Sequence, residues 1–103
     1  MDKKMILQEM LKEVRGLKVP SKKNHIYFLL QLHKILDVGF EVDSFVFDRH
    51  SKGMYLHRVQ DYFELCNKLY ENQKYCTSQR YYQAGRDAKR ELIREIEREI
   101  ERI

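Results

Sequence analysis

The chain has 103 residues, of which 43% are hydrophobic and 35% are charged, and its net charge is +4. This length fits one domain with a modest core, and the composition is that of a folded protein. The longest aliphatic and aromatic run, Ile26–Leu30, is too short to span a bilayer, and the start Met1–Ile6 lacks the apolar core of a signal peptide. We therefore expect a cytoplasmic protein that does not enter the membrane, with Cys66 and Cys76 as reduced thiols.

The positive charge is concentrated in the first part of the chain. Residues 1–39 carry eight Lys and Arg against four acids, and from Arg15 to Lys34 there are five cations and no acid. Such a segment suits a phosphate-binding surface, because each neutralised phosphate releases condensed counterions. Uneven surface charge is also common in small proteins that bind no nucleic acid, so both interpretations stay open.

Residues 2–16 are predicted to form the first helix. Asp2 is a suitable N-cap, Gly16 is a suitable end, and the apolar residues between them share one face. The breaker Val19–Ser21 follows this helix.

A second helix is predicted at about residues 22–38, capped by Ser21 or Asn24. Its apolar residues cover most of the circumference, so we expect it to be buried on nearly all sides. The remaining polar edge carries side-chain types that hydrogen-bond base edges and phosphates. A buried helix also needs some wet edge, which explains the same residues without a ligand. The residues predicted to bind nucleic acid from this region are Lys22, Lys23, Asn24, Tyr27, Gln31 and Lys34.

A β-hairpin is predicted at about residues 44–58. Residues 44–49 and 54–58 are rich in β-branched and aromatic side chains, and they flank the four-residue turn His50–Gly53. An isolated hairpin is marginal in stability, so its apolar side must pack on the helices. The cations predicted to contact flanking phosphates near its tip are Arg49 and Lys52.

A third helix is predicted at about residues 59–74, and a last helix runs from Thr77 or Ser78 to the end of the chain. The last helix has an apolar seam about 100° wide, and Arg and Glu fill the rest of its circumference. Because this seam extends to the final residue, Ile103, we expect a second copy of the protein to cover it as a coiled coil. The predicted oligomer-interface residues are Ala88, Leu92, Ile93, Ile96, Ile100 and Ile103.

Tyr81 and Tyr82 lie between two arginines near the start of the last helix. Such a pattern is compatible with stacking on unpaired bases. We favour burial of both rings, since tyrosine has an apolar ring to bury and a hydroxyl to leave wet.

The chain contains no catalytic or metal-binding motif. The four histidines show no ligand spacing, and there is no CxxC pair, glycine-rich phosphate loop, GxSxG or HExxH motif. Asp48, His50, His57, Asp61 and Glu64 cluster in sequence, but alternation along two strands would place them on both faces. We therefore expect no enzyme activity, no metal site and no cofactor.

The expected fold is mainly α (α+β), with four helices and one hairpin. This order resembles a shortened winged-helix protein, and residues 19–39 are similar to the recognition-helix region of such families. Winged-helix proteins have two helices before the recognition helix, whereas only residues 1–17 precede it here. Residues 1–77 would form the helical core with the hairpin, and residues 78–103 would form an oligomerisation helix of the same domain.

Two classes of function fit this reading best. The first is a small homodimeric nucleic-acid-binding regulator, with duplex DNA as its expected target. The second is a small interaction protein that binds and blocks a larger host protein, as many phage- and plasmid-encoded inhibitors do, because Tyr and Arg dominate protein interface hot spots. A structural oligomer subunit is a third and weaker alternative.

Overall fold

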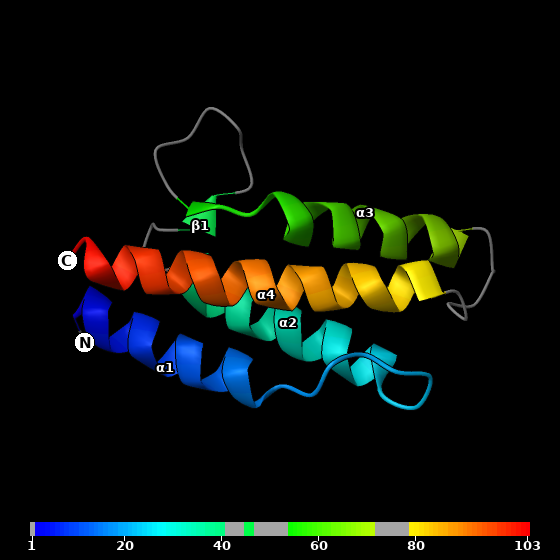
Figure 1. Cartoon of the computed structure of the whole chain (residues 1–103), viewed down its shortest axis with the longest axis horizontal. Coiled ribbons are helices and arrows are strands. Elements are labelled where there is room, and N and C mark those ends of the chain that lie inside the picture. Colours follow the sequence, from blue (N-terminus) through cyan, green and yellow to red (C-terminus); the bar gives the residue numbers. More distant parts are fainter. Residues whose placement is uncertain (1, 41–44, 47–53, 72–78) are drawn as a thin grey trace.

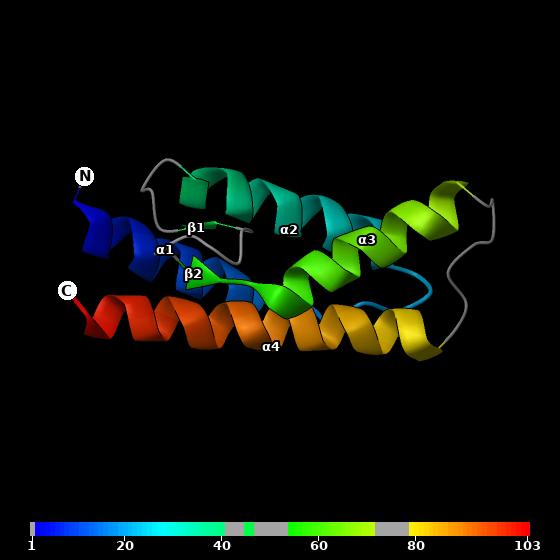
Figure 2. The ribbon, with the colours of Figure 1, turned by 90° about the horizontal axis from the view of Figure 1, so that it is seen from above.

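The computed structural model describes residues 2–40, 45–46, 54–71 and 79–103. These residues form an elongated helical protein with Cα extents of 42 × 29 × 18 Å. Figures 1 and 2 show the longest helix along the body, with the start of the first helix and the end of the last at the same end of the molecule. The helices are α1 (Lys3–Gly16), α2 (His25–Phe40), α3 (His57–Glu71) and α4 (Gln79–Glu101), and the two-residue strands are β1 (Phe45–Val46) and β2 (Met54–Tyr55).

The predicted hairpin and the winged-helix fold are wrong, because the described part of the chain is a four-helix protein. β1 and β2 pair over two residues only, and they run parallel, with Phe45 opposite Met54 and Val46 opposite Tyr55. Hairpin strands run antiparallel. Residues 57–58, predicted to end the second hairpin strand, belong instead to α3. The predicted hairpin tip lies outside the described residues.

A carboxylate from α4 explains why α3 begins so early. Oε1 of Glu91 accepts hydrogen bonds from the backbone N–H groups of Arg58 at 2.7 Å and Val59 at 3.1 Å. The first N–H groups of a helix lack partners within their own helix, and negative charge there is favourable. Leu56, just before α3, is 1% exposed. Local sequence favours a strand at these positions, and a distant tertiary contact makes them helical.

The start of α1 follows the sequence prediction. Oδ1 of Asp2 accepts a hydrogen bond from the backbone N–H of Met5 at 2.8 Å, which caps the helix. Nζ of Lys3 lies 3.0 Å from Oε1 of Glu99, so an ion pair joins the beginning of α1 to the end of α4.

All four helices contribute to one hydrophobic core. α4 runs along the length of the body, and α1 and α3 pack against it (Figure 1). Tyr62 of α3 is fully buried, and its ring centroid lies 5.8 Å from that of Phe28 and 5.6 Å from that of Tyr81. Among the side chains that are at most 2% exposed are Leu7, Met10, Val14, Phe28, Leu32, Leu36, Val59, Tyr62, Tyr81, Ala88, Leu92 and Ile96.

α2 is buried on one side only, so the prediction of nearly complete burial is wrong. Phe28 and Leu32 are fully buried, whereas Ile26 is 63% exposed and Leu30 is 60% exposed. Figure 2 shows the reason, because α2 runs along one edge of the molecule. Its inner face meets the core, and none of the described helices covers its outer face.

Candidate binding site

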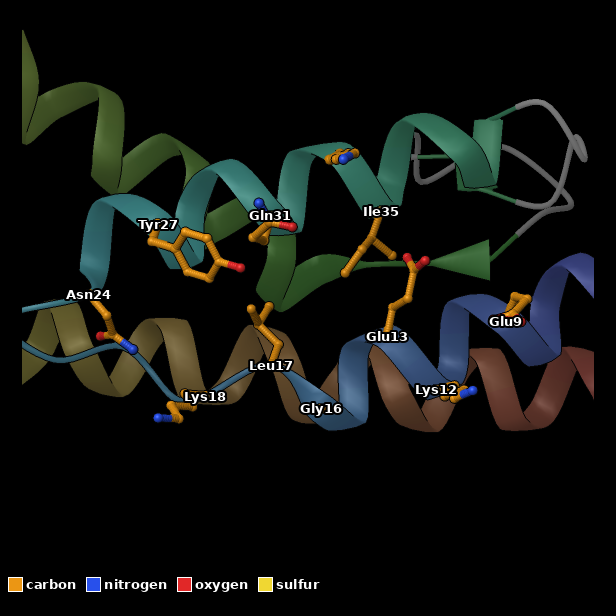
Figure 3. A pocket seen from close by; sticks show the side chains of 11 residues that line it. Glu9, Lys12, Glu13, Gly16, Leu17, Lys18, Asn24, Tyr27, Gln31 and Ile35 are labelled. Atoms are coloured by element: carbon orange, nitrogen blue, oxygen red, sulfur yellow. The ribbon is translucent and has the colours of Figure 1, made fainter.

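A groove of about 890 Å³ lies between α1 and α2 (Figure 3). Leu17 and Ile35 point into the space between the two helices and are 8% and 4% exposed, so the floor of the groove is apolar. The α1 side is lined by Glu9, Lys12, Glu13, Gly16, Leu17 and Lys18, and the α2 side by Asn24, Tyr27, Gln31, Lys34 and Ile35.

The turn between α1 and α2 is held by hydrogen bonds that set the position of α2. Oδ1 of Asn24 accepts hydrogen bonds from the backbone N–H of Ser21 at 2.6 Å and from its hydroxyl at 2.8 Å. Nδ2 of Asn24 donates to the carbonyl of Val19 at 3.2 Å. Nζ of Lys89 on α4 donates to the carbonyl of Leu17 and ties the turn to the core. These bonds fix the turn and the start of α2, which forms one wall of the groove.

Four of the predicted nucleic-acid-binding residues come together in this groove. Asn24, Tyr27, Gln31 and Lys34 line the α2 wall. Asn24 uses its side chain to hold the turn, so its role is structural rather than ligand recognition. Of the remaining four, Lys22 and Lys23 are exposed on the turn outside the groove lining, and Arg49 and Lys52 lie outside the described residues.

The opposite wall brings acidic side chains that the sequence prediction missed. Glu9 and Glu13 lie one helical turn apart on α1, and both line the groove together with Lys12 and Lys18. With Lys34 across from them, the groove carries three cations and two carboxylates. The spacing of Glu9 and Glu13 in the sequence marks them as neighbours on one polar face of α1. No feature of the sequence shows that this face lies opposite α2.

The apolar seam of α4, predicted to form an oligomer interface, is covered by other helices of the same chain. Ala88, Leu92 and Ile96 are fully buried in the core, and Ile93 and Ile100 pack against that core. The exception is Ile103, which is 57% exposed. α1 and α3 supply the apolar faces that cover the seam, so it needs no second copy to cover it. The predicted homodimer itself stays a prediction.

The other candidate groups have structural roles in the described residues. Tyr81 and Tyr82 are 2% and 9% exposed, so both rings are buried as favoured from the sequence. No group of three or more His, Cys, Asp or Glu among the described residues is placed to hold a metal ion. From the cluster around the predicted hairpin, Nε2 of His57 lies 3.5 Å from Oδ2 of Asp61, and Asp48 and His50 fall outside the described residues.

Comparisons with protein-family models, with curated proteins and with solved structures found no match to this chain. Within the described residues, every helix is too short or too polar to cross a membrane. The function is therefore inferred from the groove and from the charges around it.

Proposed function

We propose that the protein is a non-enzymatic, cytoplasmic binding protein whose groove between α1 and α2 takes up a segment of a larger protein. The observation that supports this function is an apolar floor between walls that carry both signs of charge. The floor is formed by Leu17 and Ile35. Apolar grooves of this kind receive amphipathic segments, which dock their apolar side chains while polar side chains stay at the rim.

The charges on the groove favour a polypeptide over a polyanion. A phosphate backbone in the groove would lie beside the carboxylates of Glu9 and Glu13, and like charges at close range are unfavourable. A polypeptide can meet these carboxylates with Lys or Arg and can meet Lys12 and Lys34 with Asp or Glu. Mixed charge therefore selects a partner that also carries both signs.

Tyr27 gives the groove an anchor at its rim. Its side chain is 61% exposed and lies along the α2 wall beside Gln31 (Figure 3). Exposed tyrosine is a frequent hot-spot residue, because its ring supplies contact area and its hydroxyl supplies a hydrogen bond. A chain of this size would act by occupying a binding surface on the larger protein, which is the mode of action of a small inhibitor.

A peptide-display experiment tests this function directly. A randomised twelve-residue library is selected on the wild-type protein, and each enriched peptide is then measured on two variants. Gly16→Trp is designed to place an indole in the groove, and a Cβ at Gly16 meets no atom within 4 Å, so the side chain has room to start there; circular dichroism checks that the fold is kept. Arg90→Trp adds the same side chain at an exposed site on α4 and is the control.

We expect enriched peptides with apolar residues flanked by both signs of charge. Their affinity should fall at least about tenfold on Gly16→Trp and stay unchanged on Arg90→Trp. Enrichment of no common pattern, or peptides that bind both variants equally, would contradict the proposal.

Nucleic-acid binding is a second candidate, supported by the lysines of the turn. Lys18, Lys22 and Lys23 are exposed just before the N-terminus of α2, where the helix dipole also favours negative charge. The winged-helix docking mode no longer applies, so this candidate is a small regulator that contacts DNA phosphates along the turn. It predicts an affinity for generic duplex DNA that falls steeply with added salt.

Charge-matched variants separate this candidate from general electrostatic attraction. Replacing Lys18, Lys22 and Lys23 together by Gln should reduce the salt dependence, whereas replacing Arg80, Arg90 and Arg94 on α4 by Gln should change it much less. Affinity that is flat between low and moderate salt, measured by a fluorescence anisotropy series on duplex DNA and on RNA, would rule it out.

A further inference from the structure

The groove between α1 and α2 has walls whose own backbone groups are already hydrogen-bonded. Its lining residues belong to α1, to α2 or to the turn that joins them. Within each helix the N–H and C=O groups pair with one another. In the turn, the N–H of Leu17 donates to the carbonyl of Val14 at 3.1 Å, and the carbonyl of Leu17 accepts from Nζ of Lys89. The walls therefore offer few backbone partners to a bound chain.

This property of the walls decides the conformation of the segment that binds. An extended segment binds by pairing its N–H and C=O groups with the edge of a sheet, and neither described strand lines the groove. Over the apolar floor of Leu17 and Ile35, the backbone groups of an extended segment that face the groove would stay unpaired, which is costly. A helical segment pairs its backbone internally and presents only side chains to the floor. The groove therefore favours a helix.

The exposed face of α1 extends the groove beyond Glu9. Met5 is 53% exposed and comes one helical turn before Glu9, and the two residues border a smaller hollow together with Gln8 and Lys12. Met5, Glu9, Lys12 and Gly16 follow at steps of four, three and four residues, so they lie along one face of α1. From Met5 to Gly16 this face is about 17 Å long, which a helix of about eleven residues, or three turns, covers.

The two ends of the groove carry opposite charges. Lys18 lies at the end formed by the turn, and Glu9 lies at the far end (Figure 3). In the part of the chain that the structure describes, neither side chain lies within ion-pair distance of an opposite charge. Between the two ends, the lining residues Lys12, Glu13 and Lys34 carry both signs and favour neither direction. Lys18 and Glu9 therefore distinguish one end of a bound segment from the other.

Resting on the proposed function of this groove, we propose that its partner is an amphipathic α-helix of about three turns, with an acidic side chain over Lys18 and a basic side chain over Glu9. The apolar face of this helix packs on Leu17 and Ile35, and an apolar side chain at its basic end contacts Met5. The charges set the order of the two ends, because exchanging them would place like charges together at both ends of the groove.

The helical conformation is tested on peptides from the display experiment that bind the wild type and lose affinity on Gly16→Trp. Each peptide is made with a hydrocarbon staple on the face opposite its apolar residues and is compared with the same peptide before cross-linking. An isolated twelve-residue helix is marginal in water, so the staple should raise the affinity at least about tenfold. Proline at a central position should lower the affinity at least about tenfold relative to alanine at that position.

The charge order is tested by exchanging charges on both molecules. On the wild type, a peptide whose acidic and basic ends are exchanged should bind about tenfold more weakly. On the double variant Glu9→Lys/Lys18→Glu, which keeps the net charge, the exchanged peptide should bind more tightly than the original. The matched control Lys4→Glu/Glu101→Lys reverses two exposed charges outside the groove lining and should keep the wild-type preference. Circular dichroism of each variant checks that the fold is kept.

Three results would overturn the proposal, and they can be told apart. If no peptide loses affinity on Gly16→Trp, the proposed function fails and the helical partner fails with it. If such peptides exist but tolerate the central proline or gain nothing from the staple, the groove takes extended segments, and the proposed function stands without the helix. If the wild type and Glu9→Lys/Lys18→Glu prefer the same peptide, the two ends of the groove do not select the charge order.

Discussion

α4 and α2 distribute their apolar side chains in opposite ways. α4 is the more polar helix, yet its apolar seam is covered by the rest of the chain, with Ala88, Leu92 and Ile96 fully buried. α2 is the more apolar helix, yet Ile26 and Leu30 are both at least 60% exposed. The average hydropathy of a helix therefore does not show which of its apolar side chains are buried.

The difference shows that burial depends on how many faces of a helix the rest of the chain can cover. α4 has one apolar seam, and α1 and α3 supply the amphipathic faces that cover it. α2 and α4 lie along opposite edges of the molecule (Figure 2), but α2 has apolar residues on two sides and only its inner side is covered. An excess of apolar surface on an edge helix remains exposed until another molecule packs on it.

The largest expected effect comes from truncating the same residue type on the two helices. Leu92→Ala removes a fully buried side chain and should lower the free energy of unfolding by about 3 kcal/mol, because the core cannot fill the cavity. Leu30→Ala, on the exposed face of α2, should change it by less than about 0.5 kcal/mol. Urea denaturation at low protein concentration measures both. Equal losses for the two variants would contradict the contrast between the helices.

The next effect concerns the carboxylate that joins α4 to α3. Glu91→Ala leaves the N–H groups of Arg58 and Val59 without their acceptor, and we expect a loss of about 2 kcal/mol. Glu91→Gln keeps an acceptor oxygen but removes the charge, so its loss should be about half as large. Hydrogen exchange at these two amides should accelerate more than exchange in the middle of α3. Unchanged exchange at the start of α3 would mean that the carboxylate does not hold this helix end.

This contact also explains which parts of the fold the sequence predicts. Helix signals that depend on neighbouring residues, such as the Asp2 cap of α1, are correct in the structure. The start of α3 depends on Glu91, 33 residues away from Arg58, and no local pattern contains that information. Residues 54–58 therefore look like a strand in the sequence, although residues 57–58 begin a helix.

The candidate site was predictable to a similar extent. The polar edge of α2 identifies Tyr27, Gln31 and Lys34 as neighbours, and the structure places them on one wall of the groove. Glu9 and Glu13 on the other wall depend on how α1 packs against α2. The same limit applies to the seam of α4, since periodicity shows that it is buried but does not show whether its cover comes from the same chain.

Substitutions at two glycines test how tightly the chain is packed around the middle of α4 and around the end of α1. A Cβ at Gly85 of α4 would lie 2.6 Å from Cγ of Pro20 and 3.3 Å from Cε1 of Tyr62, whereas a Cβ at Gly16 meets no atom within 4 Å. Gly85→Ala should therefore cost about 1 kcal/mol, because overpacking exceeds the gain in helix propensity. Gly16→Ala should stabilise by about 0.5 kcal/mol. Thermal or urea unfolding of the pair gives the comparison, and stabilisation by both substitutions would show that the core beneath Gly85 is loose.

The last effect comes from Tyr62, where α3 meets both α2 and α4, and it appears only at alkaline pH. Burial raises the pKa of Tyr62 well above its ordinary value, and the hydrogen bond that its hydroxyl donates to Tyr81 at 3.4 Å acts in the same direction. The unfolded chain releases this proton near pH 10 and the folded chain retains it, so the contribution is complete below pH 10 and is lost as the pH rises further.

Relative to Tyr62→Phe, the wild type should lose about 1 kcal/mol of stability between pH 9 and pH 11, measured by urea unfolding at each pH. Other tyrosines and lysines titrate in both proteins, so their contributions cancel in the difference. A constant difference across this range would mean that Tyr62 ionises equally easily in the folded chain. Water would then reach the Tyr62 hydroxyl where α2, α3 and α4 meet. The core between α4 and α2 would be less completely closed to water than the buried ring indicates.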